Sequence, residues 1–219
     1  MDMNQARFNM IEQQIRPWEV LDPQVLALLS TVRREDFVPL AHKALAFVDM
    51  EIPLGAAPNQ VMLAPRVQAR LLQDLAVLNT DKVLDVGTGS GFMAALLAHQ
   101  AASVLSLEID PALASQAQAK LQQAGVSNVT VRCADGSQGA AADGPFDAIV
   151  LNGSVAEVPA ALLQQLTVGG RLVAIVGQEP MMRATLITRT GQNSWTTTEP
   201  WDCNAPRLSG FAEPSSFHF

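Results

Sequence analysis

The sequence predicts an α/β fold in which helices cover a doubly wound, mostly parallel sheet. Three observations lead to this fold class. From Lys82 onward, apolar strands alternate with amphipathic helices, the pattern of a parallel sheet covered on both faces. A glycine-rich turn follows the first of these strands, at a position where open α/β sheets bind nucleotides. Near the C-terminus, residues 184–201 instead alternate apolar and polar, which predicts an antiparallel hairpin at the sheet edge.

The composition is that of a globular protein with one sizeable core. The chain has 219 residues, of which 48% are hydrophobic and 16% charged. Its net charge of −7 argues against a surface that binds nucleic acid or anionic lipid. Cys133 and Cys203 lack the spacing of a zinc site and are expected to be reduced thiols. Because no signal peptide or membrane-spanning run is recognisable, we expect a cytoplasmic protein that binds neither nucleic acid nor membrane.

The first part of the chain is expected to consist of helices and loops. Apolar residues recur at helical spacing up to Pro17, and Asp22-Pro23 has the form of an N-cap and first helical turn. Residues 49–65 contain three prolines and no lasting period, which predicts a long loop. Pro65 then opens another amphipathic helix.

This change of character divides the chain near residue 80. Residues 1–80 are predicted to form a helical and loop extension that carries the lid and the substrate side. Residues 81–219 are predicted to form the ligand-binding core. We expect the two parts to make one compact unit.

The elements of the core follow in regular order. The predicted strands span residues 83–87, 103–109, 128–133, 146–151 and 170–176. Helices are predicted at 92–100, 110–125 and 159–166. Two further strands, 184–190 and 194–201, form the predicted edge hairpin, and the residues beyond Trp201 are expected to be a loop.

The most specific motif is the turn Gly87-Thr88-Gly89-Ser90-Gly91, which joins the strand containing Asp85 to a helix starting at Phe92. Glycines there let the backbone turn tightly and approach a ligand, and the free N–H groups of the helix favour an electron-rich partner. A dinucleotide fingerprint would place its third glycine at Phe92, which weakens a nicotinamide interpretation. No Lys-Ser/Thr pair follows, which excludes a P-loop.

Two carboxylates complete the pattern at the ends of the next two strands. Glu108 at the end of the second strand is suited to accept both ribose hydroxyls of a nucleotide. Asp135, in Ala-Asp-Gly136 after the third strand, is suited to face an adenine amino group. Either acid alone would more often be a solvated strand-end residue. Their succession after the glycine turn favours the binding site.

These residues resemble the class I S-adenosylmethionine-dependent methyltransferases, and more narrowly the protein-L-isoaspartate O-methyltransferases. The narrower resemblance covers nearly the first 180 residues. It is carried by the following segments: Asp22 to Leu26, Val32 to Pro39, Asp49 to Gly55, Gly87 to Phe92, Asn128-Val129, Phe146-Asp147, Gly169 to Val173 and Val176-Gly177. It implies a seven-stranded sheet with its last strand antiparallel, an N-terminal extension over the cofactor, and methyl transfer to the free carboxylate of an isoaspartyl residue in a damaged protein.

The resemblance also assigns roles to individual residues. The residues that it implies for S-adenosylmethionine are Asp85, Gly87, Thr88, Gly89, Ser90, Gly91, Glu108, Ile109, Asp135, Gly136 and Asn152. Leu63 and Asn152 are the positions expected beside the reacting groups. Asn152 lies at the carboxyl end of a strand, beside the crevice. As part of Asn-Gly, it would equally suit a turn.

The acceptor side departs from the family pattern. Where the family typically has Gln-Thr-Ile-Ser-Gln-Pro, this chain has Gln60-Val61-Met62-Leu63-Ala64-Pro65, so both hydroxyls are replaced by apolar groups. Met62-Leu63 is predicted to close over the cofactor as a lid. The strand ending Leu151-Asn152-Gly153-Ser154 and the segment from Leu208 to Phe219 also differ from the family.

Three hypotheses of function remain open. The first is carboxyl methyl transfer of the isoaspartyl type, which needs no general base because a carboxylate with a pKa of ~4 is already ionised at neutral pH. The second is a methyltransferase with another acceptor, and the third is a non-catalytic module that binds the cofactor or a partner protein. No metal site is predicted, because His42, His99 and His218 lack ligand spacing. A nicotinamide-binding protein is a distant fourth alternative.

Overall fold

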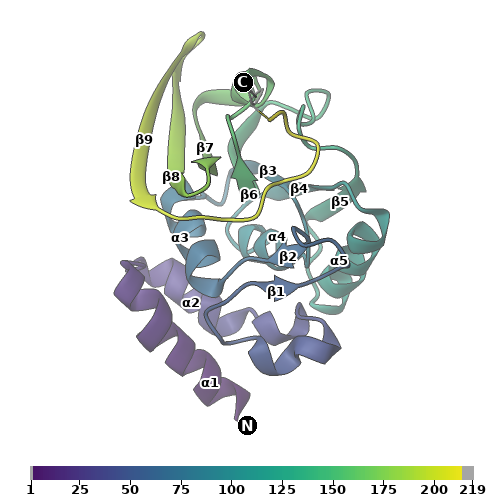
Figure 1. The fold of residues 1–219 in the computed structure, drawn as a ribbon. Coiled ribbons are helices and arrows are strands. Elements are labelled where there is room, and N and C mark those ends of the chain that lie inside the picture. The colour runs from purple at the N-terminus through teal and green to yellow at the C-terminus, as the bar shows by residue number, and fades with distance from the viewer. Residues whose placement is uncertain (1, 214–219) are drawn as a thin grey trace, which may run out of the picture.

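A computed structural model describes residues 2–213 and shows one seven-stranded sheet with strand order β5-β4-β3-β6-β7-β8-β9 (Figure 1). The strands are β3 (Lys82–Val86), β4 (Ser103–Glu108), β5 (Val129–Cys133), β6 (Phe146–Val155), β7 (Leu166–Gln178), β8 (Met181–Gly191) and β9 (Ser194–Asp202). The pairs from β5 through β7 are parallel. The fold class predicted from the sequence is confirmed.

The C-terminal edge is antiparallel in two successive pairings. β8 pairs antiparallel with β7, and β9 pairs antiparallel with β8. The predicted hairpin is therefore present, and its first strand also continues the sheet from β7. Strands β6 and β7 are longer than predicted, because β6 extends to Val155 and β7 begins at Leu166, where a helix was expected to end.

Alternate residues of the central strands face two separate hydrophobic layers. On β3, Val83 belongs to one cluster and Leu84 to the other. The first face is covered by α3 (Pro65–Leu75), α4 (Phe92–Ala98) and α5 (Pro111–Gln123), and the second by the short helix α6 (Ala160–Gln164) and loop segments. Successive side chains of a strand point to opposite faces of the sheet. Because both faces are covered, the central strands are apolar at successive positions.

The helical elements before α3 pack on α3, which in turn packs on β6 and β7 of the sheet (Figure 1). Its helical elements are α1 (Met3–Met10), the π-helical turn η1 (Ile11–Ile15), α2 (Pro23–Thr31) and the 3-10 turns η2 (Arg16–Trp18), η3 (Arg34–Asp36) and η4 (Leu40–Leu45). Asp22 caps α2 as predicted, since its side chain accepts from Gln24 N and Val25 N. The predicted loop 49–65 also contains two short antiparallel strands, β1 (Ile52–Pro53) and β2 (Val61–Met62).

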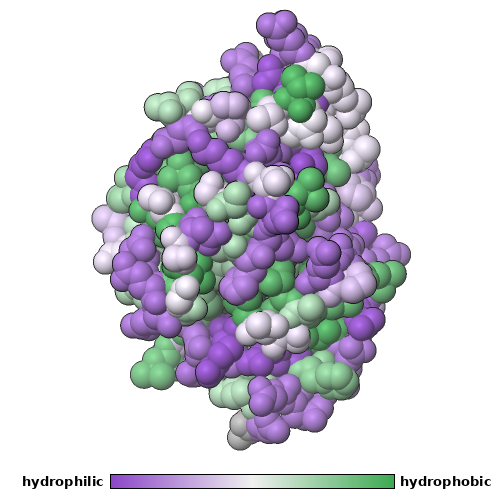
Figure 2. All heavy atoms as spheres, turned by 180° about the vertical axis from the view of Figure 1, so that it is seen from behind, coloured by the Kyte–Doolittle hydropathy of each residue, from purple (hydrophilic) through white to green (hydrophobic). Residues whose placement is uncertain are grey.

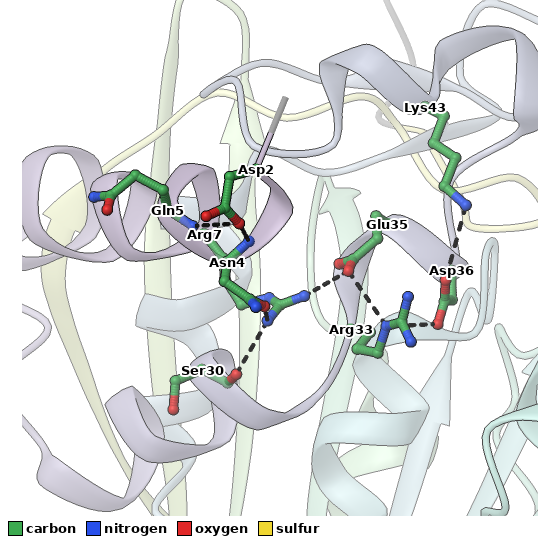
Figure 3. A network of polar contacts seen from close by, with 9 residues as sticks. All are labelled: Asp2, Asn4, Gln5, Arg7, Ser30, Arg33, Glu35, Asp36 and Lys43. Carbon is green, nitrogen blue, oxygen red and sulfur yellow. Dashed lines mark hydrogen bonds and ion pairs between the residues drawn. The ribbon is translucent and has the colours of Figure 1, made fainter.

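A buried ion pair fixes the extension internally. Arg7 of α1 places Nη2 2.5 Å from Oε1 of Glu35, whose side chain is 1% exposed. The same oxygen lies 3.3 Å from Nε of Arg33, and the network continues through Asp36 to Lys43 (Figure 3). A buried carboxylate is costly unless it is paired with a cation. Since the cation that pairs with Glu35 of η3 is Arg7 of α1, this ion pair holds the two elements together.

The extension and the C-terminal edge also meet. The rings of Trp18 and Trp201 pack edge to face with centroids 6.3 Å apart. Arg66 lies over Trp18, 4.2 Å from the ring centroid, and Trp201 Nε1 donates to Asp74 of α3. One hydrophobic cluster includes residues from both the N-terminal 80 residues and the sheet, among them Met10, Leu71 and Val150.

The face opposite to that in Figure 1 carries hydrophilic and hydrophobic side chains interspersed (Figure 2). Within residues 2–213, no helix has the length and apolar character needed to cross a membrane.

Candidate functional site

The glycine turn has the backbone geometry that its sequence predicts. Gly87, Gly89 and Gly91 have φ values of 85°, 52° and 86°, which strongly favour glycine over other residues. Gly87 N donates to Leu107 O at 2.8 Å, which ties the turn to β4. The chain then enters α4 at Phe92, so the turn lies at the crossover where ligands bind in open α/β sheets.

A cleft opens above this turn. Its floor is formed by the ends of β3 and β4, and its walls are formed by residues 54–61 and by residues 207–211. The cleft encloses about 690 Å³ including solvent at its mouth. The residues predicted to bind the cofactor that line it are Gly87, Gly89, Glu108, Ile109, Gly136 and Asn152.

Glu108 is positioned by backbone donors on both of its oxygens. Oε2 accepts from Gly89 N at 2.8 Å, and Oε1 accepts from Asp110 N at 3.0 Å. The residue is 6% exposed and lines the cleft. Each carboxylate oxygen has further lone pairs, so Glu108 keeps the capacity to accept hydroxyl groups from a ligand.

Beneath the turn lies a chain of buried polar groups centred on Asp85. Ser106 Oγ donates to Asp85 Oδ2 at 2.5 Å, and Asn152 Nδ2 donates to Asp85 Oδ1. Thr88 Oγ1 lies 2.5 Å from Ser106 Oγ, and it is the donor there because the Ser106 hydroxyl hydrogen points to Asp85. Burial raises the pKa of Asp85 to about 6, and the hydrogen bonds from Ser106 and Asn152 partly oppose this shift.

The side chain of Asn152 is oriented by one hydrogen bond, and its other polar atom has no partner among the described residues. Its Nδ2 is held by Asp85, while its Oδ1 is buried and has no hydrogen-bond partner among the described residues. A buried unpaired oxygen on the wall of a cleft is suited to accept an N–H group from a ligand. Together with the glycine turn and Glu108, this oxygen makes the cleft fit a cofactor that carries an ammonium group and ribose hydroxyls.

The remaining predicted residues lie around the cleft rather than on its lining. Ser90 Oγ accepts from Phe92 N, and Gly91 contacts α5 through its neighbour Ala117. Asp135 is exposed and accepts from Ser137 N. These residues shape the two crossovers from which the lining residues project.

Leu63 does not reach the cleft. Its side chain is 3% exposed and packs in the first hydrophobic cluster, and Met62 beside it is 2% exposed. The Leu63 carbonyl accepts from Nη2 of Arg34 at 2.8 Å. Both residues are thus part of the core, whereas Gln60 and Val61, which precede them in the loop, line the cleft.

A segment that is predicted to be a loop completes the cleft. Residues 203–213, here called the C-terminal segment, run back from β9 to the centre of the sheet (yellow in Figure 1). Leu208 N donates to Ser154 O at 2.9 Å, and a Cβ on Gly87 would lie 2.8 Å from Leu208 Cδ2. Asn59 Nδ2 donates to Arg207 O and Ser209 Oγ, which joins this segment to the opposite wall. No local sequence signal marks these long-range contacts.

Solved structures share this fold. A protein-L-isoaspartate O-methyltransferase matches 95% of this chain and 66% of its own, with a TM-score of 0.79 and 20% identity. A Plasmodium falciparum protein described as a protein-L-isoaspartate O-methyltransferase, solved with S-adenosyl-L-homocysteine, matches 94% of this chain and 99% of its own, with a TM-score of 0.76 and 17% identity. The chain thus has the Rossmann-like methyltransferase fold of these proteins.

The sequence comparisons narrow this class. The model of the protein-L-isoaspartate(D-aspartate) O-methyltransferase family matches residues 5–203. "Protein-L-isoaspartate O-methyltransferase 2" of Marinobacter nauticus is 40% identical over 89% of this chain and 88% of its own. The corresponding protein of Gloeobacter violaceus is 40% identical over 83% and 88%. The chain belongs to the protein-L-isoaspartate(D-aspartate) O-methyltransferase family.

Proposed function

We propose that this protein transfers a methyl group from S-adenosylmethionine to the free carboxylate of an isoaspartyl residue in a damaged protein, and so takes part in protein repair. The observation that carries the proposal is the family match over residues 5–203, which includes the glycine turn, Glu108 and Asn152. A cytoplasmic location remains a prediction from the sequence.

The cleft supports a definite arrangement of the cofactor. Gly87, Gly89 and Asn152 Oδ1 would hold its methionine end, Glu108 its ribose, and the Asp135-Gly136 turn with Ile109 its adenine. When bound, the cofactor supplies a methyl group activated on a sulfonium. The protein's own part is to orient this group and the acceptor, and such alignment is worth ~7–11 kcal/mol in favourable cases.

The proposed reaction needs no general base, because the acceptor carboxylate is ionised at neutral pH and no proton has to be removed from it. Leu54, Val61 and Leu208 contribute apolar surface to the cleft, which would help to exclude water from the reacting groups once the acceptor is bound. Asp85, which is buried beneath the turn, positions Asn152 rather than contacting the acceptor.

Two measurements on one preparation test the proposal. Calorimetric titration with S-adenosylmethionine and S-adenosylhomocysteine measures cofactor binding, and radiolabelled methyl transfer is then compared between an isoaspartyl peptide and its aspartyl twin. We expect binding of both compounds and labelling of the isoaspartyl peptide alone. Binding without any labelling would refute the proposed acceptor, and loss of binding would refute the cofactor site as well.

A second candidate function, methyl transfer to another acceptor, is favoured by the apolar side chain of Val61 on the cleft wall. The substitution Val61→Thr separates the two. If isoaspartate is the acceptor, a hydroxyl at this position should raise kcat/KM for the isoaspartyl peptide. If another acceptor is used, transfer to that acceptor should not improve. Because Leu63 is in the core, Leu63→Ser tests packing rather than specificity.

A further inference from the structure

Arg207 is the feature of the cleft that the proposed function leaves unused. Among the described residues that line the cleft, two are charged: Glu108, which is negative, and Arg207, which is positive. The Arg207 side chain is 25% exposed. It also lines an adjoining outer pocket together with Glu51, Asn59 and Glu179. Arg207 thus borders both the cleft and this neighbouring pocket.

Arg207 lies toward the half of the sheet opposite to most of the proposed cofactor residues. The glycine turn, Glu108 and the Asp135-Gly136 turn follow β3, β4 and β5, and Asn152 lies on β6, whereas Arg207 is held at the ends of β6 and β7. Its Nη1 donates to Ser154 Oγ at 3.3 Å, and its Nη2 donates to Gly177 O at 3.0 Å. Because the sheet order places β6 and β7 beyond β3, the guanidinium lies on the side left for the acceptor.

The guanidinium already binds a carboxylate of the chain itself. Nε of Arg207 lies 2.8 Å from Oε1 of Glu213, whose side chain is 52% exposed. An arginine has five N–H donors, and the three contacts to described residues leave one N–H free on each terminal nitrogen. An exposed ion pair of this kind contributes only ~0–1 kcal/mol, so an incoming carboxylate is able to compete with Glu213.

We propose that Arg207 binds the carboxylate of the methyl acceptor, and that Glu213 occupies the guanidinium as an internal competitor when no acceptor is present. This inference rests on the proposed function. Val61 and Leu63 offer no hydroxyl donor to an acceptor oxygen, and Arg207 supplies charged donors on the same cleft. The methyl ester product is neutral, so its attraction to Arg207 is weaker than that of the acceptor.

The test is equilibrium binding of an isoaspartyl peptide, and of its methyl ester, to the protein saturated with S-adenosylhomocysteine. Removing a charged hydrogen-bond partner costs ~1.5–3 kcal/mol, so Arg207→Gln should weaken peptide binding by about 10- to 100-fold. Arg207→Lys should restore part of the affinity. The wild-type protein should prefer the free carboxylate to the ester, and Arg207→Gln should lose this preference.

The substitution Glu213→Gln leaves Arg207 in place and should change the affinity for the peptide in the opposite direction. Removing the competitor should tighten peptide binding and lower KM. If Arg207 only anchors the C-terminal segment, this variant should leave both unchanged. The matched control is Arg183→Gln on β8, an exposed arginine that also pairs with a glutamate, Glu199, but lies outside the cleft. It should leave peptide affinity unaltered.

The possible failures are distinguishable. If the wild-type protein methylates the isoaspartyl peptide but Arg207→Gln binds that peptide equally well, the inference alone is overturned. If Arg207→Gln weakens S-adenosylhomocysteine binding and leaves peptide binding intact, the guanidinium serves the cofactor's carboxylate and the inference is again overturned. If the wild-type protein binds S-adenosylhomocysteine but neither binds nor methylates the peptide, the proposed acceptor fails and the inference fails with it.

Discussion

At the scale of single residues, Glu108 is the side chain on which cofactor binding is expected to depend most. Its two oxygens are aligned by Gly89 N and Asp110 N, so the carboxylate is already oriented toward the cleft. Hydrogen bonds to a charged group contribute ~1.5–3 kcal/mol, so Glu108→Ala should weaken S-adenosylhomocysteine binding by about 10- to 100-fold. Calorimetric titration measures this, with Glu199→Ala on the edge strand β9 as control. Unchanged affinity in Glu108→Ala would contradict the assigned role.

Asp85 should make the stability of the protein depend on pH. Its pKa rises from 3.8 to about 6 on burial, so between these values the folded state binds more protons than the unfolded state. The free energy of unfolding should therefore fall as pH rises through this window, by as much as about 3 kcal/mol, and level off above it.

Urea denaturation at several pH values, compared between the wild-type protein and Asp85→Asn, isolates this contribution. The difference in unfolding free energy should change between about pH 4 and pH 6 and then stay constant. The exposed Asp135→Asn serves as the control. A difference that does not vary across this range would mean that Asp85 does not titrate there.

Residues differ in how far local sequence predicts their place. Gly87, Gly89 and Glu108 were predictable as cleft residues because strand period and turn chemistry are local, and the structure puts all three on the lining. The position of Leu63 was not predictable in this way. A proline-rich loop has no hydrophobic period that would distinguish residues facing the core from residues facing the cleft. Arg207 and Leu208 reach Gly87 and Ser154 across long stretches of chain, and only tertiary packing brings them there.

At the scale of elements, Gly91 links the glycine turn to the packing of two helices. Its φ is 86°, and a Cβ there would lie 3.3 Å from Ala117 of α5. Gly91→Ala should cost ~1–2 kcal/mol from backbone strain and a further amount from this contact. Gly125→Ala is the matched control, because its φ is 73° and nothing lies within 4 Å. Thermal unfolding should show Gly91→Ala to be less stable than Gly125→Ala. An equal loss of stability in the two variants would mean that α5 moves away from the added methyl group at no cost.

The order of the elements was predictable from the sequence, but some of their boundaries were not. The order of strands and helices from Lys82 was predictable because each has its own hydrophobic period. The lengths of β6 and β7 were not predictable from the sequence. Their additional residues lie in turn-like sequence and are strands only because the two strands pair with each other. The strands β1 and β2 are two residues long and exist through their mutual pairing, for which a single segment carries no signal.

At the scale of the whole molecule, we propose that residues 1–80 and 81–219 fold as one unit. Residues of both parts share one hydrophobic cluster, and α3 packs against both the N-terminal helices and the sheet. Unfolding should therefore be a single cooperative transition, with equal calorimetric and van't Hoff enthalpies and coincident far- and near-ultraviolet dichroism curves. Two separate transitions would show that the extension and the core are independent domains.

The contact between Trp18 and Trp201 joins the N-terminal extension to the last strand of the sheet. The chain has three tryptophans and no tyrosine, so its near-ultraviolet emission comes almost entirely from indole rings, two of which form this junction. The protein therefore carries an intrinsic fluorophore at the place where the N-terminal extension meets strand β9. Separation of these two parts would change the emission of these rings without any attached dye, and Trp195, away from the junction, provides the background signal.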